Sequence, residues 1–476
     1  MFIRKENKCR GPLYSENGSL KKSQANNLLL VVSVVILAGL IFQIVGFSVK
    51  IVVIAFAFVA FGISFVNAEL ALIFLIFSML LSPELIMGEA GRREVMIRAD
   101  DVFLGVVILG WFARMALDKD LALFKGTPLN GPIAGYIAMC LISTLYSAVL
   151  GRLSFLTGFF FTLKYIEYFL LFFMVVNVIQ SKVQIKRFVY MMFFVFVLIS
   201  IYAWLQRASG IQRVSTPFEG QSGEANTLGG YLVFMIMLAL GILFNIREKY
   251  TRFFLGVSVC LALPALMFTL SRGSWIAFIP AATVLFVLSR KGKLMMTVLL
   301  LFTFCFAAWI FPREVKERFA YTFEEQVEYD FLGKRITLDE SAAARIEAWV
   351  LGIDRWKRSP VIGHGVGSPG PIVDNQYTRT LTETGTIGFI LFSVIILRLL
   401  GVTYYVIRKR EEDDFYHGLA CGFYAGIVGL LFHSLSAASF IIIRIIEPFW
   451  FVAAIIVALP RILQEEEKQT DAGTSA

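Results

Sequence analysis

Long apolar stretches alternate with short polar segments along nearly the whole chain. The stretches are about 17–22 residues long, which is the length that lets an α-helix cross the hydrocarbon core of a bilayer. The weak apolar–polar alternation over about ten residues that is typical of outer-membrane barrels is absent from the sequence. The pattern therefore predicts an all-α fold, a polytopic bundle of about fourteen transmembrane helices, at residues 28–46, 51–66, 68–83, 102–117, 130–150, 159–179, 188–206, 229–246, 253–270, 274–289, 294–311, 380–402, 416–434 and 440–459.

The composition agrees with a membrane protein. Of the 476 residues, 58% are hydrophobic and 17% are charged, against about 25% charged in soluble domains. A soluble globule could not bury that much apolar surface, and disordered, collagen-like and small disulfide-rich chains are excluded as well. The net charge of +9 would suggest nucleic acid in a soluble protein, but here most basic residues stand at helix ends, where membrane topology explains them. We therefore expect no nucleic-acid partner, and the positions of the five cysteines predict no disulfide.

Lysines and arginines in short loops predict the orientation, because such residues collect on the cytoplasmic side. With the N-terminal tail in the cytoplasm, basic clusters of several separate loops fall on that side, near Lys119, Lys182, Arg247, Arg290 and Arg408. The first apolar run is interpreted as a retained anchor and not as a cleaved signal peptide. The predicted organisation is a cytoplasmic basic tail (1–27), helices 1–11 (28–311), an outer, periplasmic loop subdomain (312–379), helices 12–14 (380–459) and a cytoplasmic tail (460–476).

The long outer loop contains an amphipathic segment followed by a glycine-rich one. Apolar residues recur at helical spacing within residues 343–357, which predicts a helix. Pro360 would end that helix. The glycines of residues 363–371 cannot hold a helix, and we expect a tight turn whose backbone approaches a ligand closely.

Asp374 and Asn375 stand at the expected start of the next helix, whose following turns carry Gly385 and Gly388. A carboxylate and an amide at the outer mouth of a helix could carry chemistry, and the glycines would allow close helix packing. The alternative, which local sequence alone favours, is that the two polar residues cap the helix.

Arginines at the outer ends of the helices form a second group of candidates. Arg272 lies between two apolar runs with almost no loop, so it must be paired, face a wet cavity or snorkel to the interface. Arg345 lies on the loop helix, where a solvated helix face is the simpler interpretation. Arg213 and Asn226 belong to the polar outer segment 207–228, which could contact a phosphate or be merely solvated.

The remaining candidates have simpler explanations. Asp100 and Asp101 are adjacent carboxylates that could form a base or metal site, but a helix cap is favoured. Lys164 is spaced i, i+3 from Glu167, which suits a self-neutralising pair. No His or Cys cluster has metal-ligand spacing, and the sequence contains neither a Walker A loop nor a dinucleotide fingerprint. We expect no metal and no cofactor.

Four features, taken in order, resemble the O-antigen ligase / O-antigen polymerase superfamily of bacterial membrane glycosyltransferases. They are the segment from Asn226 to Tyr231 after an outer loop, Ser271-Arg272-Gly273 between spans, Arg345 to Trp349 followed by Pro360 and the glycine-rich turn, and Asp374-Asn375 followed by Gly385 and Gly388. The resemblance covers roughly residues 200–400. Ligases usually have His where this chain has Asp374, so the departure favours a polymerase and makes His364 a candidate for the missing imidazole.

The resemblance implies a donor glycan carried on undecaprenyl pyrophosphate at the outer leaflet of the inner membrane. The acceptor would be a second lipid-linked glycan for a polymerase or lipid A–core for a ligase, and a chain-length regulator is a candidate partner. Arg272 and Arg345 would stabilise charge on the diphosphate leaving group, and Asp374 or His364 would accept the hydroxyl proton. The implied substrate-binding residues are Asn375, Tyr377, Arg213, Asn226, Lys164, Gly385 and Gly388. An alternative of another class is a lipid-linked oligosaccharide flippase or transporter.

Overall fold

The structure is a computed structural model. It describes residues 49–82, 84–90, 93–117, 125–217, 224–289, 327–331, 334–338, 340–368, 374–409 and 414–474. The expected N-terminal tail and the expected spans at 28–46 and 294–311 lie outside the described residues.

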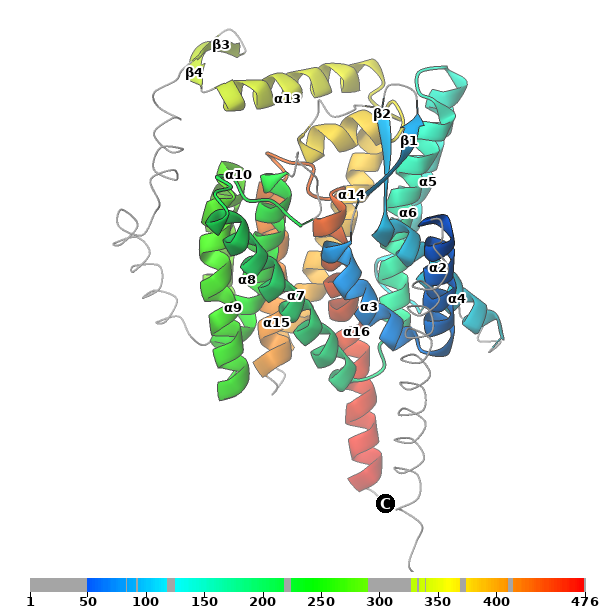
Figure 1. Cartoon of the computed structure of the whole chain (residues 1–476), viewed down its shortest axis with the longest axis vertical. Helices are drawn as coiled ribbons and strands as arrows, with labels where there is room; N and C mark the ends of the chain where they lie inside the picture. Colours follow the sequence, from blue (N-terminus) through cyan, green and yellow to red (C-terminus); the bar gives the residue numbers. More distant parts are fainter. Residues whose placement is uncertain are drawn as a thin grey trace, which may run out of the picture.

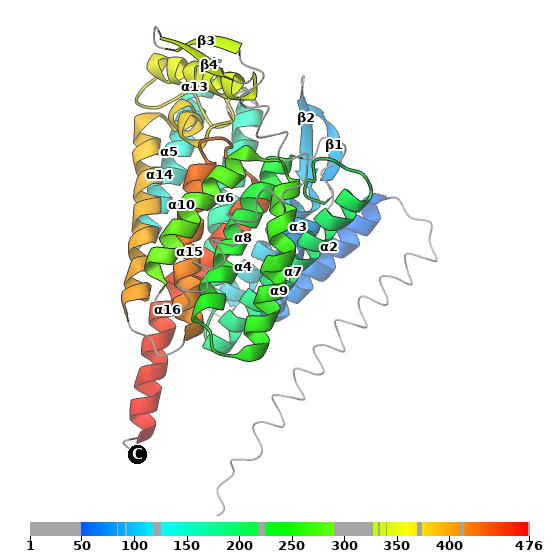
Figure 2. The ribbon, with the colours of Figure 1, turned by 90° about the vertical axis from the view of Figure 1, so that its left-hand side faces the viewer.

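Thirteen α-helices make up nearly all of the described structure, and most of them stand side by side as a bundle (Figures 1 and 2). Each expected span within the described residues coincides with one of them. The helices are α2 (Val49–Val66), α3 (Ala68–Leu81), α4 (Ala99–Leu117), α5 (Asn130–Val149), α6 (Phe155–Val178), α7 (Lys182–Ala208), α8 (Ala225–Asn245), α9 (Lys249–Phe268), α10 (Arg272–Leu288), α13 (Glu340–Arg358), α14 (Gln376–Arg408), α15 (Asp414–His433) and α16 (Ile443–Thr474).

Eight of the described helices are long and apolar enough to cross a bilayer, namely α5, α6, α7, α8, α9, α14, α15 and α16. Helix α3, with 14 residues, is only about 21 Å long, against a hydrocarbon core of about 30 Å. The chain is a multi-pass helical membrane protein, while the count of fourteen spans stays a prediction.

Helices α8 and α15 pack closely in the centre of the bundle. Almost every residue of α8 is buried, and glycines let the α15 backbone lie directly against it. A Cβ atom added at Gly241 would stand 2.4 Å from the Gly418 carbonyl oxygen, and one at Gly422 would stand 2.6 Å from the Met237 carbonyl oxygen. Small residues bring helix backbones together in membranes, where lipid tails are as apolar as the helices. Outward residues such as Leu397, 66% exposed, are apolar too, as a lipid-facing surface requires.

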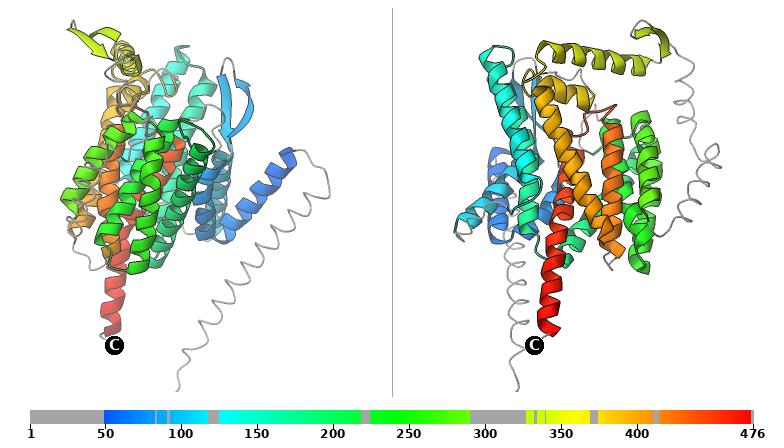
Figure 3. Two further views of the ribbon diagram at one scale, coloured as in Figure 1. Left: turned by 60° about the vertical axis from the view of Figure 1, so that its left-hand side comes forward. Right: turned by 180° about the vertical axis from the view of Figure 1, so that it is seen from behind.

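One end of the bundle carries elements that the apolar pattern does not describe. Helix α13 lies across this end instead of running along the bundle (Figures 1 and 3). It confirms the helix expected at 343–357 and ends at Arg358, just before Ser359 and Pro360.

The thirteen helices confirm the all-α class, and two short antiparallel hairpins add to it. Strand β1 (Glu84–Ala90) pairs with β2 (Arg93–Arg98), and β3 (Val327–Phe331) pairs with β4 (Lys334–Leu338). Only two residues separate the strands of each pair in the sequence, which is typical of a tight hairpin. Such short strands lie outside the apolar runs, so hydropathy could not reveal them.

Candidate functional site

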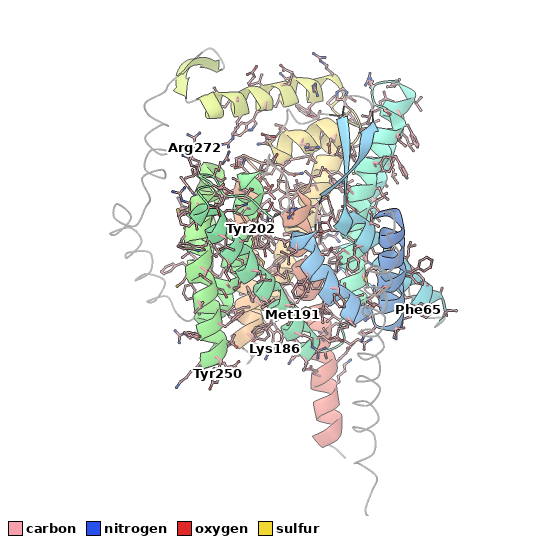
Figure 4. The ribbon with its side chains drawn as sticks, in the orientation of Figure 1. Phe65, Lys186, Met191, Tyr202, Tyr250 and Arg272 are labelled. Atoms are coloured by element: carbon pink, nitrogen blue, oxygen red, sulfur yellow. The ribbon has the colours of Figure 1, made fainter. Side chains whose placement is uncertain are left out.

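A cavity of about 540 Å³ lies at the end of the bundle that α13 crosses. Figure 4 shows Arg272 at this end. The lining residues come from the loop before α8 with the first turn of that helix, from the α9–α10 turn, from α13 and from the residues before α14. They are Arg213, Asn226, Leu270, Ser271, Arg272, Ala344, Arg345, Glu347, Ala348, Leu351 and Asp374. Five candidates from the sequence, Arg213, Asn226, Arg272, Arg345 and Asp374, therefore meet in one place.

The turn between α9 and α10 positions Arg272. Leu270 has a φ of 49°, a left-handed conformation that costs a non-glycine residue roughly 1–2 kcal/mol. Ser271 caps α10, because its hydroxyl accepts a hydrogen bond from the Ser274 backbone N–H. The same hydroxyl donates to Asn226 Oδ1 over 2.8 Å. These bonds tie the turn to α8, and Arg272, the first residue of α10, is held at the cavity wall.

Arg213 belongs to the same wall. Its Nε donates to the Thr269 carbonyl over 3.2 Å, and its Nη2 lies 3.4 Å from Asn226 Oδ1. Asn226 therefore accepts hydrogen bonds from both Ser271 and Arg213. The guanidinium of Arg213 is thus fixed beside the turn that carries Arg272.

Helix α13 contributes a second wall. Arg345 is half-buried in the cavity lining, so it does not occupy a freely solvated helix face. Its neighbours Ala344 and Ala348 are small, which leaves space beside the guanidinium. Glu347 lines the cavity as well, and the lining holds three arginines against two carboxylates.

Asp374 is the carboxylate that comes from the α14 side. Partial burial raises the pKa of Asp374 above its ordinary value, while the positive charges of Arg345 and Arg379 pull the pKa down. At the start of α8, burial and then the charge of Asp374 raise the pKa of Glu224, and Arg213 opposes that rise. The carboxylates and guanidinium groups therefore act on one another across the cavity.

This arrangement suits an anionic ligand. Guanidinium groups pair in fork geometry with phosphate oxygens. The N-terminus of α10, where Arg272 stands, adds backbone N–H groups and the positive end of the helix dipole. A carboxylate with a raised pKa is suited to accept a proton. The cavity can therefore hold a phosphate group next to a proton acceptor.

Asn375 and Tyr377 lie next to the cavity in sequence but make structural contacts. Asn375 is buried and caps α14, because its Oδ1 accepts from the backbone N–H groups of Tyr377 (2.8 Å) and Thr378 (3.0 Å). The Tyr377 hydroxyl donates to the Leu431 carbonyl over 2.6 Å. The capping alternative thus holds for Asn375, and binding of substrate by either residue stays a prediction.

The glycine-rich turn after α13 packs against α14. Gly363 and Gly365 have φ values of 84° and 89°. The backbone N–H groups of His364 and Gly365 donate to the carbonyls of Thr382 (2.8 Å) and Glu383 (3.0 Å). The expected close backbone approach is present, with the α14 backbone as its partner, and contact of the turn with a ligand stays a prediction.

His364 stands apart from the cavity lining. Its ring Nε2 donates to the Arg355 carbonyl over 2.7 Å, which anchors the turn to the end of α13. The residues lining the described cavity do not include it.

Gly385 produces a kink in α14 where the turn docks. Its φ is 67°, and an added Cβ would stand 2.2 Å from the Val361 carbonyl oxygen. A Cβ at Gly388 would meet the Thr384 side chain instead. Both glycines serve packing within the described structure, and a part in substrate binding stays a prediction.

Glu383 and Arg379 form a buried network that the sequence reasoning missed. Glu383 Oε1 accepts from Arg379 Nε (3.0 Å) and from the Gly367 backbone N–H (3.1 Å), and Oε2 accepts from the Tyr165 hydroxyl (3.1 Å). The Ser143 hydroxyl donates to the Glu383 carbonyl. A glutamate four residues after an arginine, at the start of an expected span, was the available signal. The network joins α5, α6, the glycine-rich turn and α14.

Lys164 lies outside the cavity lining. Its Nζ stands 3.6 Å from Asp101 Oδ2, which joins α6 to the first turn of α4. The expected partner was Glu167, so the lysine has a cross-helix partner as well. Binding of substrate by Lys164 stays a prediction.

A comparison with known protein families finds one match. Residues 257–393 match the family model described as O-antigen ligase. The matched segment contains Arg272, Arg345 and Asp374, whereas Arg213 and Asn226 precede it. No curated protein matches the chain. The family match confirms the resemblance to the O-antigen ligase and polymerase superfamily, and with it a membrane function of that general type.

Proposed function

From the O-antigen ligase match over residues 257–393, we propose that the protein is a glycosyltransferase that polymerises oligosaccharide repeats carried on undecaprenyl pyrophosphate. The observation that carries the proposal is the cavity lined by Arg213, Arg272, Arg345 and Asp374. A diphosphate concentrates negative charge on a few oxygens, and arginine side chains are the protein groups best suited to bind it.

The reaction in this proposal is a direct displacement. The acceptor hydroxyl oxygen attacks the anomeric carbon of the donor, and the bond from that carbon to the diphosphate oxygen breaks. The electron pair leaves with the diphosphate, and Arg272 and Arg345 stabilise the added charge. The hydroxyl proton passes to the Asp374 carboxylate. One base and no enzyme nucleophile correspond to inversion at the anomeric carbon, and the scheme uses neither metal nor cofactor.

Asp374 is preferred to His364 as the base. The carboxylate lies in the cavity lining, whereas the His364 ring donates a hydrogen bond to the Arg355 carbonyl. In the proposal Arg213 and Asn226 contact the donor. Asn375, Tyr377, Gly385 and Gly388 contribute by positioning the start of α14.

Two alternatives remain as outcomes of the test. A ligase would use the same donor with lipid A–core as acceptor, and the aspartate at position 374, where ligases usually have His, favours the polymerase. A flippase would move the lipid-linked glycan without forming a glycosidic bond. Transporters place their polar binding groups near the bilayer midplane, whereas the cavity that the three arginines line includes Arg272, which Figure 4 shows at one end of the bundle.

The proposal also sets the orientation. The cavity end and the segment 312–379 face the periplasm, the two termini lie in the cytoplasm, and the bilayer is the bacterial inner membrane. The lipid-linked donor then reaches the cavity from the outer leaflet, and a chain-length regulator is the proposed protein partner.

The test replaces the cavity residues one at a time. Purified full-length protein in nanodiscs receives an undecaprenyl-pyrophosphate-linked repeat unit, and the product chain length is followed on gels. Loss of a catalytic base typically costs 10²–10⁴-fold in rate, so we expect Asp374→Asn to lower polymer formation by about that factor. Arg272→Ala should also abolish long chains, while both variants insert and express normally.

Matched controls remove the same charge outside the cavity. Arg358→Ala and Asp354→Asn change exposed residues of α13 and should keep the full chain-length distribution. Unchanged polymer in Asp374→Asn and Arg272→Ala would refute the proposal. Transfer only to lipid A–core would identify the ligase, and translocation without new glycosidic bonds would identify the flippase.

A further inference from the structure

A buried ion pair lies at the start of α14, close in sequence to the proposed base. Arg379 and Glu383 belong to the first turns of this helix, at the end of the bundle that α13 crosses (Figure 1). Arg379 Nε donates to Glu383 Oε1 over 3.0 Å, and the two side chains are only 13% and 1% exposed. Arginine and glutamate are almost never buried so fully unless they are paired. Pairing permits the burial but gives no reason for it, and the proposed reaction gives neither residue a part.

The cap of α14 brings Arg379 close to Asp374. Asn375 is the N-cap, so Asp374 is the residue before the cap and Arg379 is the fourth residue of the helix. Side chains at these two positions commonly pack against each other at helix starts, usually as an apolar pair. Here the two positions hold a carboxylate and a guanidinium. The positive charge of Arg379 accordingly acts on the Asp374 carboxyl and opposes the rise in its pKa that burial causes.

The surroundings of Asp374 separate the roles of two arginines. The charged groups near it among the described residues are Arg345 and Glu347 from α13, Arg272 from α10, Arg213 and Glu224 from the segment before α8, and Arg379 from α14. Arg345 and Arg379 both lower the pKa of Asp374, and Arg345 has the larger effect. Arg345 lines the cavity, whereas the lining of the described cavity does not include Arg379. Arg379 can therefore act on the carboxylate without contacting the donor.

Glu383 has contacts that do not by themselves require an ion pair. Its Oε1 accepts from the Gly367 N–H and its Oε2 from the Tyr165 hydroxyl, each over 3.1 Å. Uncharged acceptor oxygens could hold the glycine-rich turn in the same way. A buried ion pair also adds little stability, because the cost of desolvating two charges offsets their attraction. What the carboxylate provides in addition is an anchor that holds the Arg379 cation near Asp374.

We propose that Arg379, held in place by Glu383, is a positioning residue that keeps the Asp374 carboxylate ionised for transfer of the acceptor proton. The inference rests on the proposed function, because it takes Asp374 as the base. The proton of the attacking hydroxyl passes to an Asp374 oxygen, while Arg379 keeps its own protons throughout. Arg345 contacts the diphosphate as well as acting on the base, and Arg379 acts on the base alone. Donor affinity should therefore be independent of Arg379.

The experiment measures the pH–rate profile of polymer formation by full-length Arg379→Gln in nanodiscs with the lipid-linked repeat unit. This variant keeps the bonds of Glu383 to Tyr165 and Gly367. Because Asp374 loses a cation that stabilises its charged form, the midpoint of the acidic side should move to higher pH by about one unit. Below that midpoint the rate should be about tenfold lower than in the wild type. The maximal rate at higher pH and the KM for the donor should stay within about twofold.

Three further variants separate this role from a merely structural one. Arg379→Lys keeps the charge and should keep the wild-type midpoint. Arg379→Gln/Glu383→Gln removes the pair without leaving a lone buried carboxylate, so it tests the same shift if the single variant fails to fold. The matched control is Arg461→Gln/Glu465→Gln, which removes an arginine–glutamate pair of the same spacing on α16 and should leave the profile unchanged.

The outcomes distinguish this inference from the proposed function. A midpoint that stays in place or moves to lower pH in Arg379→Gln would overturn the role of Arg379. An equal shift in Arg379→Lys, or a large rise in the KM for the donor, would overturn it too. If Asp374→Asn is inactive in the same assay, the transferase proposal stands and the role of Arg379 alone fails. Activity retained in Asp374→Asn would instead refute the proposed base.

Discussion

Asp374 stands between opposing influences on its protonation. Burial raises the pKa of its carboxyl, and the positive charges of Arg345 and Arg379 lower it. Burial is the larger cause, so the pKa lies above the ordinary value of 3.8. As a base the group must be ionised, and activity should therefore fall with decreasing pH before an ordinary aspartate would be protonated.

Replacing Arg345 should shift the acidic side of the pH–rate profile, which we call the acid limb. Arg345→Gln takes away a cation that stabilises the carboxylate, so the pKa of Asp374 rises and the limb shifts to higher pH. The maximal rate should also fall, by about 10²–10³-fold for a lost charge-stabilising donor. The pH–rate profile of polymer formation checks both effects. Arg358→Gln should leave the profile unchanged, and a limb that stays in place or moves to lower pH in Arg345→Gln would contradict Asp374 as the base.

At the scale of elements, the kink of α14 determines where the glycine-rich turn can dock. The Thr386 N–H donates to the Pro360 carbonyl over 2.8 Å, and Trp356 Nε1 of α13 lies 3.2 Å from Thr386 Oγ1. These contacts require a backbone at Gly385 that other residues rarely adopt. The kink at Gly385 therefore allows α13 and the glycine-rich turn to pack against α14.

Replacing that glycine should be costly. In Gly385→Ala the new Cβ meets the Val361 carbonyl at 2.2 Å with a φ of 67°. Strained backbone alone costs roughly 1–3 kcal/mol, so we expect at least that loss of stability, measured as a lower midpoint of thermal unfolding in detergent, together with reduced activity. Gly401→Ala is the control in the same helix, because no atom beyond its chain neighbours and the surrounding helix backbone lies within 4 Å of its added Cβ. It should be neutral or slightly stabilising, and equal behaviour of the two variants would refute the role of the kink.

At the scale of the molecule, the two ends of the bundle differ in chemistry. One end has a cavity that mixes arginines with Asp374 under α13, and the other has a cavity whose lining includes Glu69, Arg114, Lys125 and several amide side chains. Under the proposed orientation these ends face the periplasm and the cytoplasm. The molecule thus offers each leaflet a different polar surface.

Cysteine labelling tests that orientation. Ser209 is exposed at the end of the bundle that carries the Arg272 cavity, and Lys249 is exposed at the opposite end. In a background without the native cysteines, Ser209→Cys should react with a membrane-impermeant maleimide on intact cells. Lys249→Cys should react at least tenfold less until the membrane is permeabilised. The reverse labelling pattern would show that the orientation is opposite to the one proposed. The background protein without an added cysteine gives the baseline of the labelling.

The helices were predictable because each depends on a local, periodic property. Apolar runs locate α5 to α9 within several residues, and the stripe at 343–357 locates α13. The hairpins were missed because pairing of β1 with β2 depends on cross-strand bonds and not on an apolar run. The glycines of the turn showed that close backbone approach was available, but not that Thr382 and Glu383 would be the partners.

Five polar residues of the cavity lining were predictable from the sequence, whereas the rest of the lining and the contacts that support it were not. Arg272, Arg345 and Asp374 were found from motif order, because the charged residues stand out in an apolar chain. Glu383 was missed because its meaning depends on Tyr165 and Ser143, which are more than two hundred positions away in sequence. Long-range contacts of this kind leave no local pattern.

The way α13 is fastened has a mechanical consequence for Arg345. Two of the described hydrogen bonds between α13 and α14 lie in the C-terminal half of α13, where the Thr382 hydroxyl donates to the Gly352 carbonyl and Trp356 Nε1 donates to Thr386 Oγ1. Arg345 lies seven residues before Gly352 in the chain, so it sits on an arm about 10 Å beyond that pivot. A rocking motion of about 5° about the pivot would swing the guanidinium by roughly 1 Å at this lever length, enough to make or break its bond to a phosphate oxygen.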